Sequence, residues 1–461
     1  MRDGSTADAH SVSETLSHWL AGLDPAHIPG SVRDAAIDTL IDVAGLAVAA
    51  RKTDYMEALI ASWDGDGPCT ALGHGAGFDA AGAAMINGTA AHGEDFDNTF
   101  EGCPVHTGAV VVPAVLAAAE RYGLGGDRAL AGIAAGIEVM CRLGLVAGTH
   151  IHSAGFHPTA VLGTFAAAAG VGVALGLPAR ALVDALGISG SMSSGIIEYL
   201  AEGSWTKRMH AGWAAQSGLR AALLGQHGFT GPRTVFEGEH GFFFGFAPAL
   251  DPDFAPLLDG LGVSWEIERL AFKPFACGTM TQPYIDCAIE LKGLGIAPDD
   301  IAEITCEAAE RTLHRLWEPL ASKQRPPSPY GAKFSTPYCV AVGFLDGDAG
   351  LAQFTDDRIS DSAVLGLAAK VRYRVDPDNE YPSNYTGHLK ATLKDGTVHE
   401  IRRPHLRGGR RQPLTRADLL GKFTLNAIFG GWTEDQAGRL ASFCETLAGR
   451  ADLSGLADFR G

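Results

Sequence analysis

The uncharged run AVLGTFAAAAGVGVALGL, Ala160 to Leu177, decides the fold class of this 461-residue chain. A run of this length without charge is long enough to cross a membrane as a helix. Its bulk comes from Ala and Gly, however, and it follows His157-Pro158 without the basic or aromatic flanks typical of membrane interfaces. Because small residues let helix backbones approach closely, we interpret the run as a buried helix of a bundle.

The sequence around this run predicts a large helical domain. From about Ser11 to Gly260, apolar segments with helical spacing are separated by Gly and Pro, as in Val32 to Ala50. Strands and helices do not alternate there, which argues against a dinucleotide-binding parallel sheet.

The pattern changes near residue 265. The segment DIAEITCEA alternates with period two, and GHLKATLKDGTVHEIRR contains two alternating runs around Asp395-Gly396, which is a strong hairpin signal. Helical patterning returns from Thr415. The sequence therefore predicts a mainly α protein with an α+β part. Residues 1–267 and 406–461 form a helical domain from both chain ends, and residues 268–405 form an inserted α+β domain.

Composition excludes several classes of protein. With 46% hydrophobic and 19% charged residues, the chain can bury a substantial core. Its formal charge of -17 has the wrong sign for general attraction to nucleic acid or to an anionic membrane. The eight cysteines include no CxxC pair, so we expect free thiols, and the start MRDGSTADAHSVSETLSHWL lacks a secretory pattern, so we expect a cytoplasmic protein.

The stretch HGEDFDNTFEGCPVH, from His92 to His106, concentrates polar side chains in an Ala- and Gly-rich chain. His92 and Asp95 share a helix face, and a metal could use them with Asp97 and His106. The calcium-loop pattern fails, because Phe100 stands where glycine is needed and His106 where glutamate is needed. We expect no metal, which leaves an acid–base site or a solvated acidic loop.

Two further segments carry candidate anion-binding residues. In GFHPTAVLGT, Pro158 starts a helix and places the imidazole of His157 beside the helix N-terminus, where anions are attracted. In GSWTKRMHAGWAAQSG, Lys207, Arg208 and His210 form a cluster of cations suited to binding carboxylates. The alternatives are a structural histidine and a surface Lys/Arg pair. Lys273, in FKPFACGTMTQPY, does not by itself indicate a binding site.

In this order, these segments resemble the MmgE/PrpD family, which contains 2-methylcitrate dehydratases, cis-aconitate decarboxylases and iminodisuccinate epimerases. The resemblance covers nearly the whole chain, and its markers are NGTAAHGEDFDNTF, VHTGAVVVPAVLAAAE, GFHPTAVLGTFAAA, WTKRMHAGWAAQSG, FKPFACGTMTQPYIDCA and FSTPYCVA. It implies a helical domain with an inserted α+β lid, a homodimer, and an active site between the two domains that uses no metal or organic cofactor.

The resemblance also implies a set of site residues. Asp95 and His106 would transfer protons, Lys207 and Lys273 would pair with substrate carboxylates, and His157 would act as an acid or as a binder. Because Lys207 and Lys273 lie on different predicted domains, we expect closure of the lid to assemble the anion site. The full set implied by the family motifs is Asp95, Thr99, His106, His157, Lys207, Lys273 and Tyr338.

Departures from the family pattern bear on the substrate. Asn98 replaces the second aspartate of the DFDDT motif, Cys277 stands where the animal decarboxylase has a histidine, and Gln282 stands where many relatives have one. These changes weaken a decarboxylase assignment. We expect a lyase acting on a small di- or tricarboxylate, foremost a hydro-lyase of the 2-methylcitrate dehydratase type and, as the second choice, a decarboxylase of the cis-aconitate type. The alternatives are a dicarboxylate epimerase and a non-catalytic homodimer that binds a carboxylate.

Overall fold

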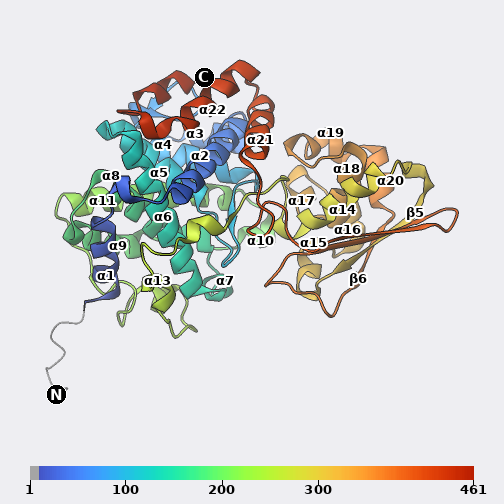
Figure 1. Ribbon diagram of the computed structural model, residues 1–461, viewed down its shortest axis with the longest axis horizontal. Helices are drawn as coiled ribbons and strands as arrows, with labels where there is room; N and C mark the ends of the chain where they lie inside the picture. Colours follow the sequence, from blue (N-terminus) through green and yellow to red (C-terminus); the bar gives the residue numbers. More distant parts are fainter. Residues whose placement is uncertain (1–9) are drawn as a thin grey trace. The chain divides into compact units, whose positions relative to one another are not determined.

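The computed structural model describes residues 10–461, and its architecture is mainly α with an α+β part, as the sequence predicts (Figure 1). Residues 1–9, which belong to the stretch examined for a targeting signal, lie outside the described residues. The chain divides into two compact units. The first takes in the chain up to Gly93, then Asp97–Leu270 and Arg416–Gly461, and the second takes in Glu94–Phe96 and Ala271–Thr415.

The second unit extends further along the chain than the sequence-based boundary at residue 405. The basic loop before Thr415 belongs to it, because the backbone of Phe272 donates to the carbonyl of Gly408 at 2.9 Å. The guanidinium of Arg407 also pairs with the carboxylate of Asp286 at 2.9 Å. These two contacts explain why a segment that looks like a linker in the sequence is part of the α+β unit.

The first unit is a bundle of helices with a few short strands. The helices are α1 (Val12–Ala21), α2 (Gly30–Ala50), α3 (Asp54–Ala61), α4 (Ala80–Gly93), α5 (Gly108–Tyr122), α6 (Gly126–Ala147), α7 (His150–Ser153), α8 (Pro158–Leu175), α9 (Ala179–Met192), α10 (Tyr199–Glu202), α11 (Thr206–Gln226), α12 (Phe242–Phe246), α13 (Ala255–Leu258), α21 (Arg416–Phe429) and α22 (Glu434–Glu445). The strands β1 (Asp66–Thr70) and β2 (Gly77–Phe78) form an antiparallel pair.

Helix α8, which contains the uncharged run, lies in the core and packs against α5, α6, α9 and α11. Helices α6 and α8 are long and apolar enough to cross a membrane, but each buries 94% of its apolar window inside the protein. Glycine makes the close approach possible, since a Cβ atom on Gly132 would lie 2.5 Å from the carbonyl oxygen of Gly170. The prediction of a buried bundle helix is confirmed.

A second close approach joins α4 to α11. A Cβ atom on Gly212 would lie 2.1 Å from the carbonyl oxygen of Met85, and one on Gly88 would lie 2.7 Å from the Cα of Gly212. Such contacts admit only glycine, so the two backbones touch at this crossing.

Both ends of the described chain contribute to the helical unit. Helix α2 (blue in Figure 1) packs beside α21 and α22 (red), which return from the C-terminal end. A buried ion pair joins the two segments, with the ammonium of Lys422 2.6 Å from the carboxylate of Asp42. An ion pair taken out of water fixes register more than it adds net stability.

The second unit is built on a four-stranded sheet of order β6-β5-β7-β8, in which β5 is parallel to β6 and the other pairs are antiparallel. Helix α14 packs against β7 and β8, and α18 packs on α14. The elements are α14 (Gln282–Gly293), β5 (Ile301–Ala308), α15 (Leu313–Leu316), α16 (Leu320–Gln324), α17 (Pro329–Ala332), α18 (Thr336–Asp346), α19 (Asp356–Ile359), α20 (Ser362–Ala368), β6 (Val371–Val375), β7 (Gly387–Leu393) and β8 (Val398–Arg403).

The predicted hairpin is present and joins β7 to β8. The backbone of Leu393 donates to the carbonyl of Thr397 at 2.8 Å, which closes the turn. Asp395 accepts from the backbone N–H of Thr397 at 2.9 Å, and Gly396 has a φ of 90°, a conformation that glycine adopts without strain. The alternating run before it forms β5, as predicted.

Candidate active site

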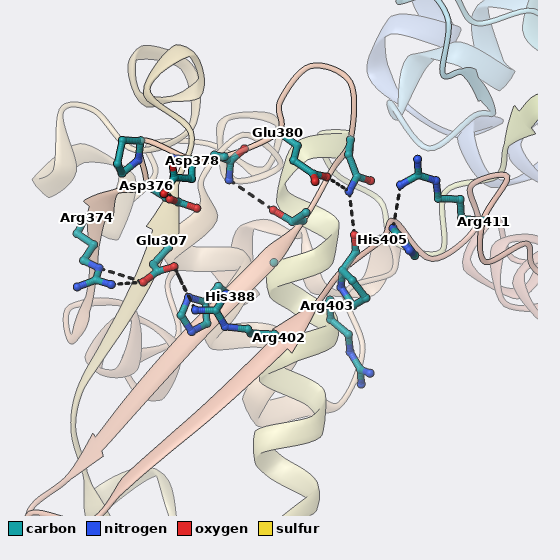
Figure 2. A pocket seen from close by; sticks show the side chains of 16 residues that line it. Glu307, Arg374, Asp376, Asp378, Glu380, His388, Arg402, Arg403, His405 and Arg411 are labelled. Atoms are coloured by element: carbon teal, nitrogen blue, oxygen red, sulfur yellow. Dashed lines mark hydrogen bonds and ion pairs between the residues drawn. The ribbon is translucent and has the colours of Figure 1, made fainter.

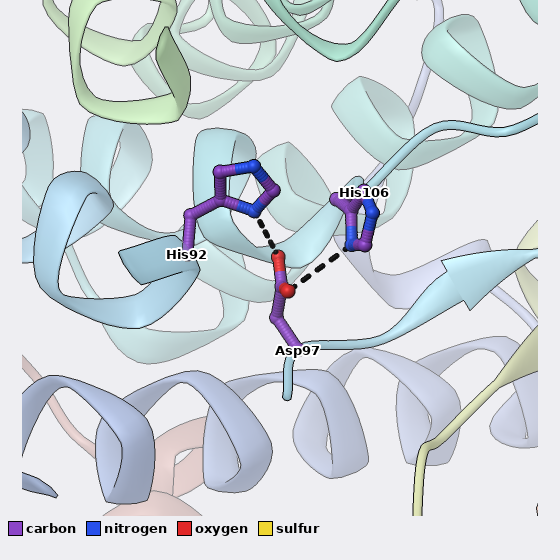
Figure 3. Close-up of side chains that lie close together, drawn as sticks. All are labelled: His92, Asp97 and His106. Atoms are coloured by element: carbon purple, nitrogen blue, oxygen red, sulfur yellow. Dashed lines mark hydrogen bonds and ion pairs between the residues drawn. The ribbon is translucent and has the colours of Figure 1, made fainter. Parts of the chain in front are cut away.

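The core of the candidate site is a buried carboxylate between two histidines (Figure 3). His92 lies in the last turn of α4, and the following loop brings Asp97 and His106 to face it. The Nδ1 atom of His92 lies 2.8 Å from one carboxylate oxygen of Asp97, and Nδ1 of His106 lies 3.1 Å from the other. Asp97 therefore holds both imidazoles through the same ring nitrogen and leaves both Nε2 atoms for other partners.

These three side chains offer donor atoms within 4.8 Å of one another, close enough for one metal ion. In this arrangement Nδ1 of His92 is hydrogen-bonded to one oxygen of Asp97, and Nδ1 of His106 lies within ion-pair distance of the other. Burial raises the pKa of Asp97, but the charges of His106 and His92 outweigh it and hold that pKa well below its usual range. Asp97 is therefore a carboxylate at any pH where the protein works.

Asn98 explains how the loop is held in place. Its backbone N–H donates to the carboxylate of Asp42 at 3.1 Å, and its side-chain oxygen accepts from the backbone N–H of Gly108 at 3.1 Å. Gly108 is the first residue of α5, so this bond satisfies a donor at a helix start. The departure from the DFDDT pattern thus has a structural role in the loop that carries Asp97.

His157 lies directly before α8 and has the extended backbone expected before proline. Its backbone N–H donates to the carbonyl of Gly195 at 2.9 Å. Its ring stacks on that of His92 with centroids 5.7 Å apart, and its Nδ1 lies 3.1 Å from the Nδ1 of His210. The four imidazoles of His92, His106, His157 and His210 therefore form one continuous group.

The inner pair of this group is held neutral. Burial lowers the pKa of His157 well below its usual range, and the charges of His92 and Lys207 lower it further. Burial, followed by the same two charges, lowers the pKa of His210 to about 4. At neutral pH each of the two rings therefore carries one proton, on one of its two nitrogens.

The remaining predicted residues of the first unit differ in their surroundings. Lys207 is half-buried in the first turn of α11, and its charge acts on both His157 and His210. The guanidinium of Arg208, next along the helix, lies 4.4 Å over the ring of Tyr55, which gives it a cation–π contact within the protein. Thr99 is half-buried in strand β3 (Thr99–Phe100).

In the second unit, Lys273 pairs with Asp95. Its ammonium donates to the backbone carbonyl of Asp95 at 2.7 Å and lies 3.4 Å from the carboxylate, and both residues are buried. Asp95 has a φ of 54° and is the only residue other than glycine with a positive φ between residues 10 and 461. Such a conformation costs about 1–3 kcal/mol and persists only where the surroundings impose it. Lys273 therefore positions Asp95 and neutralises its charge.

The neighbouring acidic residue is held in the same way. The ammonium of Lys333 donates to the backbone carbonyl of Glu94 and to its carboxylate, both at 2.7 Å. Two buried lysines of the second unit thus fix two consecutive acidic residues.

Two family models match this chain. The MmgE/PrpD N-terminal domain matches residues 14–255, and the MmgE/PrpD C-terminal domain matches residues 275–441. The chain belongs to the MmgE/PrpD family. The prediction from the sequence motifs is therefore confirmed at the level of the family.

Curated relatives agree with this membership. A cis-aconitate decarboxylase of Aspergillus terreus is 27% identical over 89% of this chain and 88% of its own length. The cis-aconitate decarboxylases of mouse and human are each 30% identical over 75% of this chain, and over 71% and 72% of their own lengths. Because these relatives are lyases, the comparisons support an enzyme of the lyase type at the level of the family.

Within this MmgE/PrpD chain, the structure brings together some of the predicted residues. His106, His157 and Lys207 belong to one cluster of the first unit, while Asp95 and Lys273 form a pair in the second. In the sequence, Asp97 was a candidate only as a metal ligand and His210 only as a cation. Their places in the histidine cluster were not predicted. The signal for His210 was its spacing of three residues from Lys207, which places both on one face of α11.

Tyr338 has a structural hydrogen bond. Its side chain is fully buried in α18, its hydroxyl donates to the backbone carbonyl of Gln353 at 2.6 Å, and burial raises its pKa. Its contact with substrate stays a prediction.

The two departures in the second unit are also buried. The amide of Gln282 donates to the carbonyls of Phe275 and Cys277 at 3.3 and 3.2 Å, so this side chain supports the loop that follows Lys273. The thiol of Cys277 is wholly buried. Neither side chain replaces the acid–base group that a histidine would supply at its position.

A polar cavity of about 640 Å³ lies within the second unit, beside the sheet (Figure 2). Several of its charged groups have partners within the lining, since Glu307 contacts both Arg374 and His388, and Asn384 donates to Glu380. Mutually paired charges indicate a structural network, so the histidine cluster of the first unit is the stronger candidate for catalysis.

Proposed function

We propose that this protein is a lyase that acts on a small di- or tricarboxylate by proton transfer at a carbon next to a carboxylate. The observation that carries the proposal is the triad in which buried Asp97 fixes the imidazole of His106. Because Asp97 stays ionised and lies 3.1 Å from Nδ1 of His106, it favours the tautomer protonated at Nδ1, in which Nε2 is the basic nitrogen. The ring of His106 is 12% exposed, whereas that of His92 is fully buried, so His106 is the ring that substrate reaches.

Asp95 is less suited to removing the proton, because Lys273 lies 3.4 Å from its carboxylate. Lys207 would instead bind a carboxylate of the substrate and stabilise the negative charge that develops on carbon, and the pairing of Lys273 with substrate stays a prediction from the family motifs. His157 would deliver or receive the second proton.

The names of the relatives make cis-aconitate the first substrate to test. In that decarboxylation a C–C bond breaks and CO₂ leaves. The electron pair of the broken bond remains on the carbon skeleton, which takes up one proton. A hydro-lyase acting on 2-methylcitrate would use the same groups to remove a proton and expel hydroxide, which leaves as water. The absence of an acid–base group at Cys277 favours this second reaction.

A dicarboxylate epimerase would return the proton to the opposite face of the same carbanion. Incubation with cis-aconitate, 2-methylcitrate and a panel of dicarboxylates in heavy water separates the three reactions. A decarboxylase releases CO₂, a hydro-lyase forms an unsaturated acid, and an epimerase incorporates deuterium without net loss of substrate.

The matched variants are His106→Gln and His74→Gln, since His74 is a half-buried histidine of the same unit outside the cluster. We expect His106→Gln to lower kcat about 10²- to 10⁴-fold, the usual contribution of general acid–base catalysis, and His74→Gln to leave it unchanged. Full activity of His106→Gln would refute the assigned base. If no acid is turned over or exchanged but one stabilises the fold, the protein is a carboxylate-binding homodimer. The homodimer and the cytoplasmic location stay predictions, checked by light scattering and by cell fractionation.

A further inference from the structure

The contact between His157 and His210 has a chemical requirement that an ordinary hydrogen bond lacks. Both residues are buried, with exposed fractions of 5% and 4%, and their Nδ1 atoms lie 3.1 Å apart. A hydrogen bond between two Nδ1 atoms needs one proton between them. One ring must therefore carry its proton on Nδ1 and the other must leave Nδ1 bare.

The surroundings of the pair oppose a second proton. His92 stacks on His157, the charges of His106 and Lys207 act on it, and the ring of Tyr199 lies edge-on to both imidazoles, at 5.9 Å from His157 and 5.8 Å from His210. Since burial and the charge of Lys207 disfavour further positive charge, the pair is held as two neutral rings. The position of the shared proton then decides which of the two rings has a basic Nε2.

His210 also borders a cavity that His157 does not line. This cavity, of about 550 Å³, lies entirely within the first unit, and His210, Tyr199 and Trp213 line it together with the carboxylates of Glu198 and Glu202. The two carboxylates supply groups that exchange protons with water. His210 thus connects the buried His157 to a largely apolar cavity on the side of α10 and α11, which Glu198 and Glu202 border.

We propose that His210 is a positioning residue that sets the tautomer of His157 and exchanges protons between His157 and this cavity. The inference rests on the proposed function, in which His157 transfers the second proton. In the delivering direction, Nε2 of His210 takes a proton from the cavity, its Nδ1 proton passes to Nδ1 of His157, and Nε2 of His157 gives its proton to the substrate carbanion. The rings end in the opposite tautomers, and the starting tautomers return when Nε2 of His157 takes up a proton on the substrate side and the same transfers run in reverse, releasing a proton to the cavity.

The first test needs no substrate. In protein labelled with ¹⁵N-histidine, we expect one of the two rings at pH 7 to have a protonated Nδ1 and the other a bare Nδ1, with His74→Gln used to assign an unrelated signal. In the variant His210→Gln, the amide keeps a hydrogen bond to His157 but has no titratable nitrogen. A charged pair, or two protonated Nδ1 atoms, would overturn the proposal whatever reaction the enzyme catalyses.

The second test is chemical rescue. We expect His210→Ala to lower kcat about 100-fold, the lower end of a general acid–base contribution, with KM changed less than about threefold. Imidazole added to the solution enters the space left in the cavity and restores at least a tenth of the activity, to an extent that follows the pKa of substituted imidazoles. His210→Ala with full kcat, or a folded variant that no imidazole rescues, would contradict the relay. If wild type turns over no acid, the proposed function fails, and the labelling experiment still decides the relay.

Discussion

Replacement of Asp97 by asparagine is the sharpest test of the triad, because it removes a charge without changing the shape of the side chain. A hydrogen bond to a charged group contributes about 1.5–3 kcal/mol, and a neutral one about 0.5–1.5 kcal/mol. Asp97 makes two such contacts, at 2.8 and 3.1 Å, so the neutral amide forfeits about 2–3 kcal/mol of interaction with the two histidines.

If the whole loss raises the free energy of the transition state, kcat/KM falls about 10²-fold, because each 1.36 kcal/mol corresponds to a factor of ten in rate. The amide N–H also favours the wrong tautomer of His106, and the corresponding change in the serine protease triad costs about 10⁴-fold. We therefore expect a loss between about 10² and 10⁴ in steady-state kinetics. Stability falls by no more than about 2 kcal/mol at pH 7, because the variant also avoids burying a charge.

The matched control is Asp184→Asn. Asp184 is another buried aspartate of the helical unit, paired with Arg180 at 2.7 Å and accepting from the backbone N–H of Gly231 at 3.0 Å. We expect this variant to lose stability in urea unfolding and to keep its kcat. The reasoning fails if Asp97→Asn retains full activity, or if Asp184→Asn loses as much activity at equal stability.

Three further predictions concern stability and metal. The lowered pKa values of His157 and His210 mean that the native state binds fewer protons than the unfolded chain, so the free energy of unfolding falls as pH drops from above 6.5 toward about 4. Urea titrations at pH 7 and pH 5 measure this loss, which is roughly 2 kcal/mol between these two pH values for His210 alone. Asn98→Ala leaves the N–H of Gly108 without its acceptor and costs about 1–3 kcal/mol in the same assay; an unchanged midpoint would contradict the bracing role. Dialysis against a chelator leaves turnover unchanged if the triad works through hydrogen bonds, whereas a loss restored by one added divalent ion would mean that the cluster holds a metal.

The fold follows largely from local patterns in the sequence. The Ala- and Gly-rich run of α8 has no polar face, so it can only be buried, and the Asp395-Gly396 turn joins two alternating strands. The second unit ends at Thr415 and not at the sequence-based boundary of residue 405, because the contact of Gly408 with Phe272 joins residues far apart in the chain. Contacts of this kind leave no periodic signal.

The candidate site was predictable in its residue types and less so in its geometry. The proline after His157 fixes the backbone there, and the structure has that conformation. No spacing rule reveals that Asp97 lies between His92 and His106, because the loop that brings them together depends on Asn98. Partners of this kind are set by the tertiary structure, and motifs alone do not order them.

The glycine crossing of α4 and α11 has a consequence for how substitutions affect this enzyme. Gly88 precedes His92 by one helical turn, and Gly212 follows His210 by two residues, so the two backbones that carry these imidazoles touch next to them. A single methyl group at either glycine would push the two helix backbones apart and widen the gap between the rings of His92 and His210, without altering any ionisable group. The spacing between the helix segments that carry His92 and His210 is thus set by the thickness of two bare backbones.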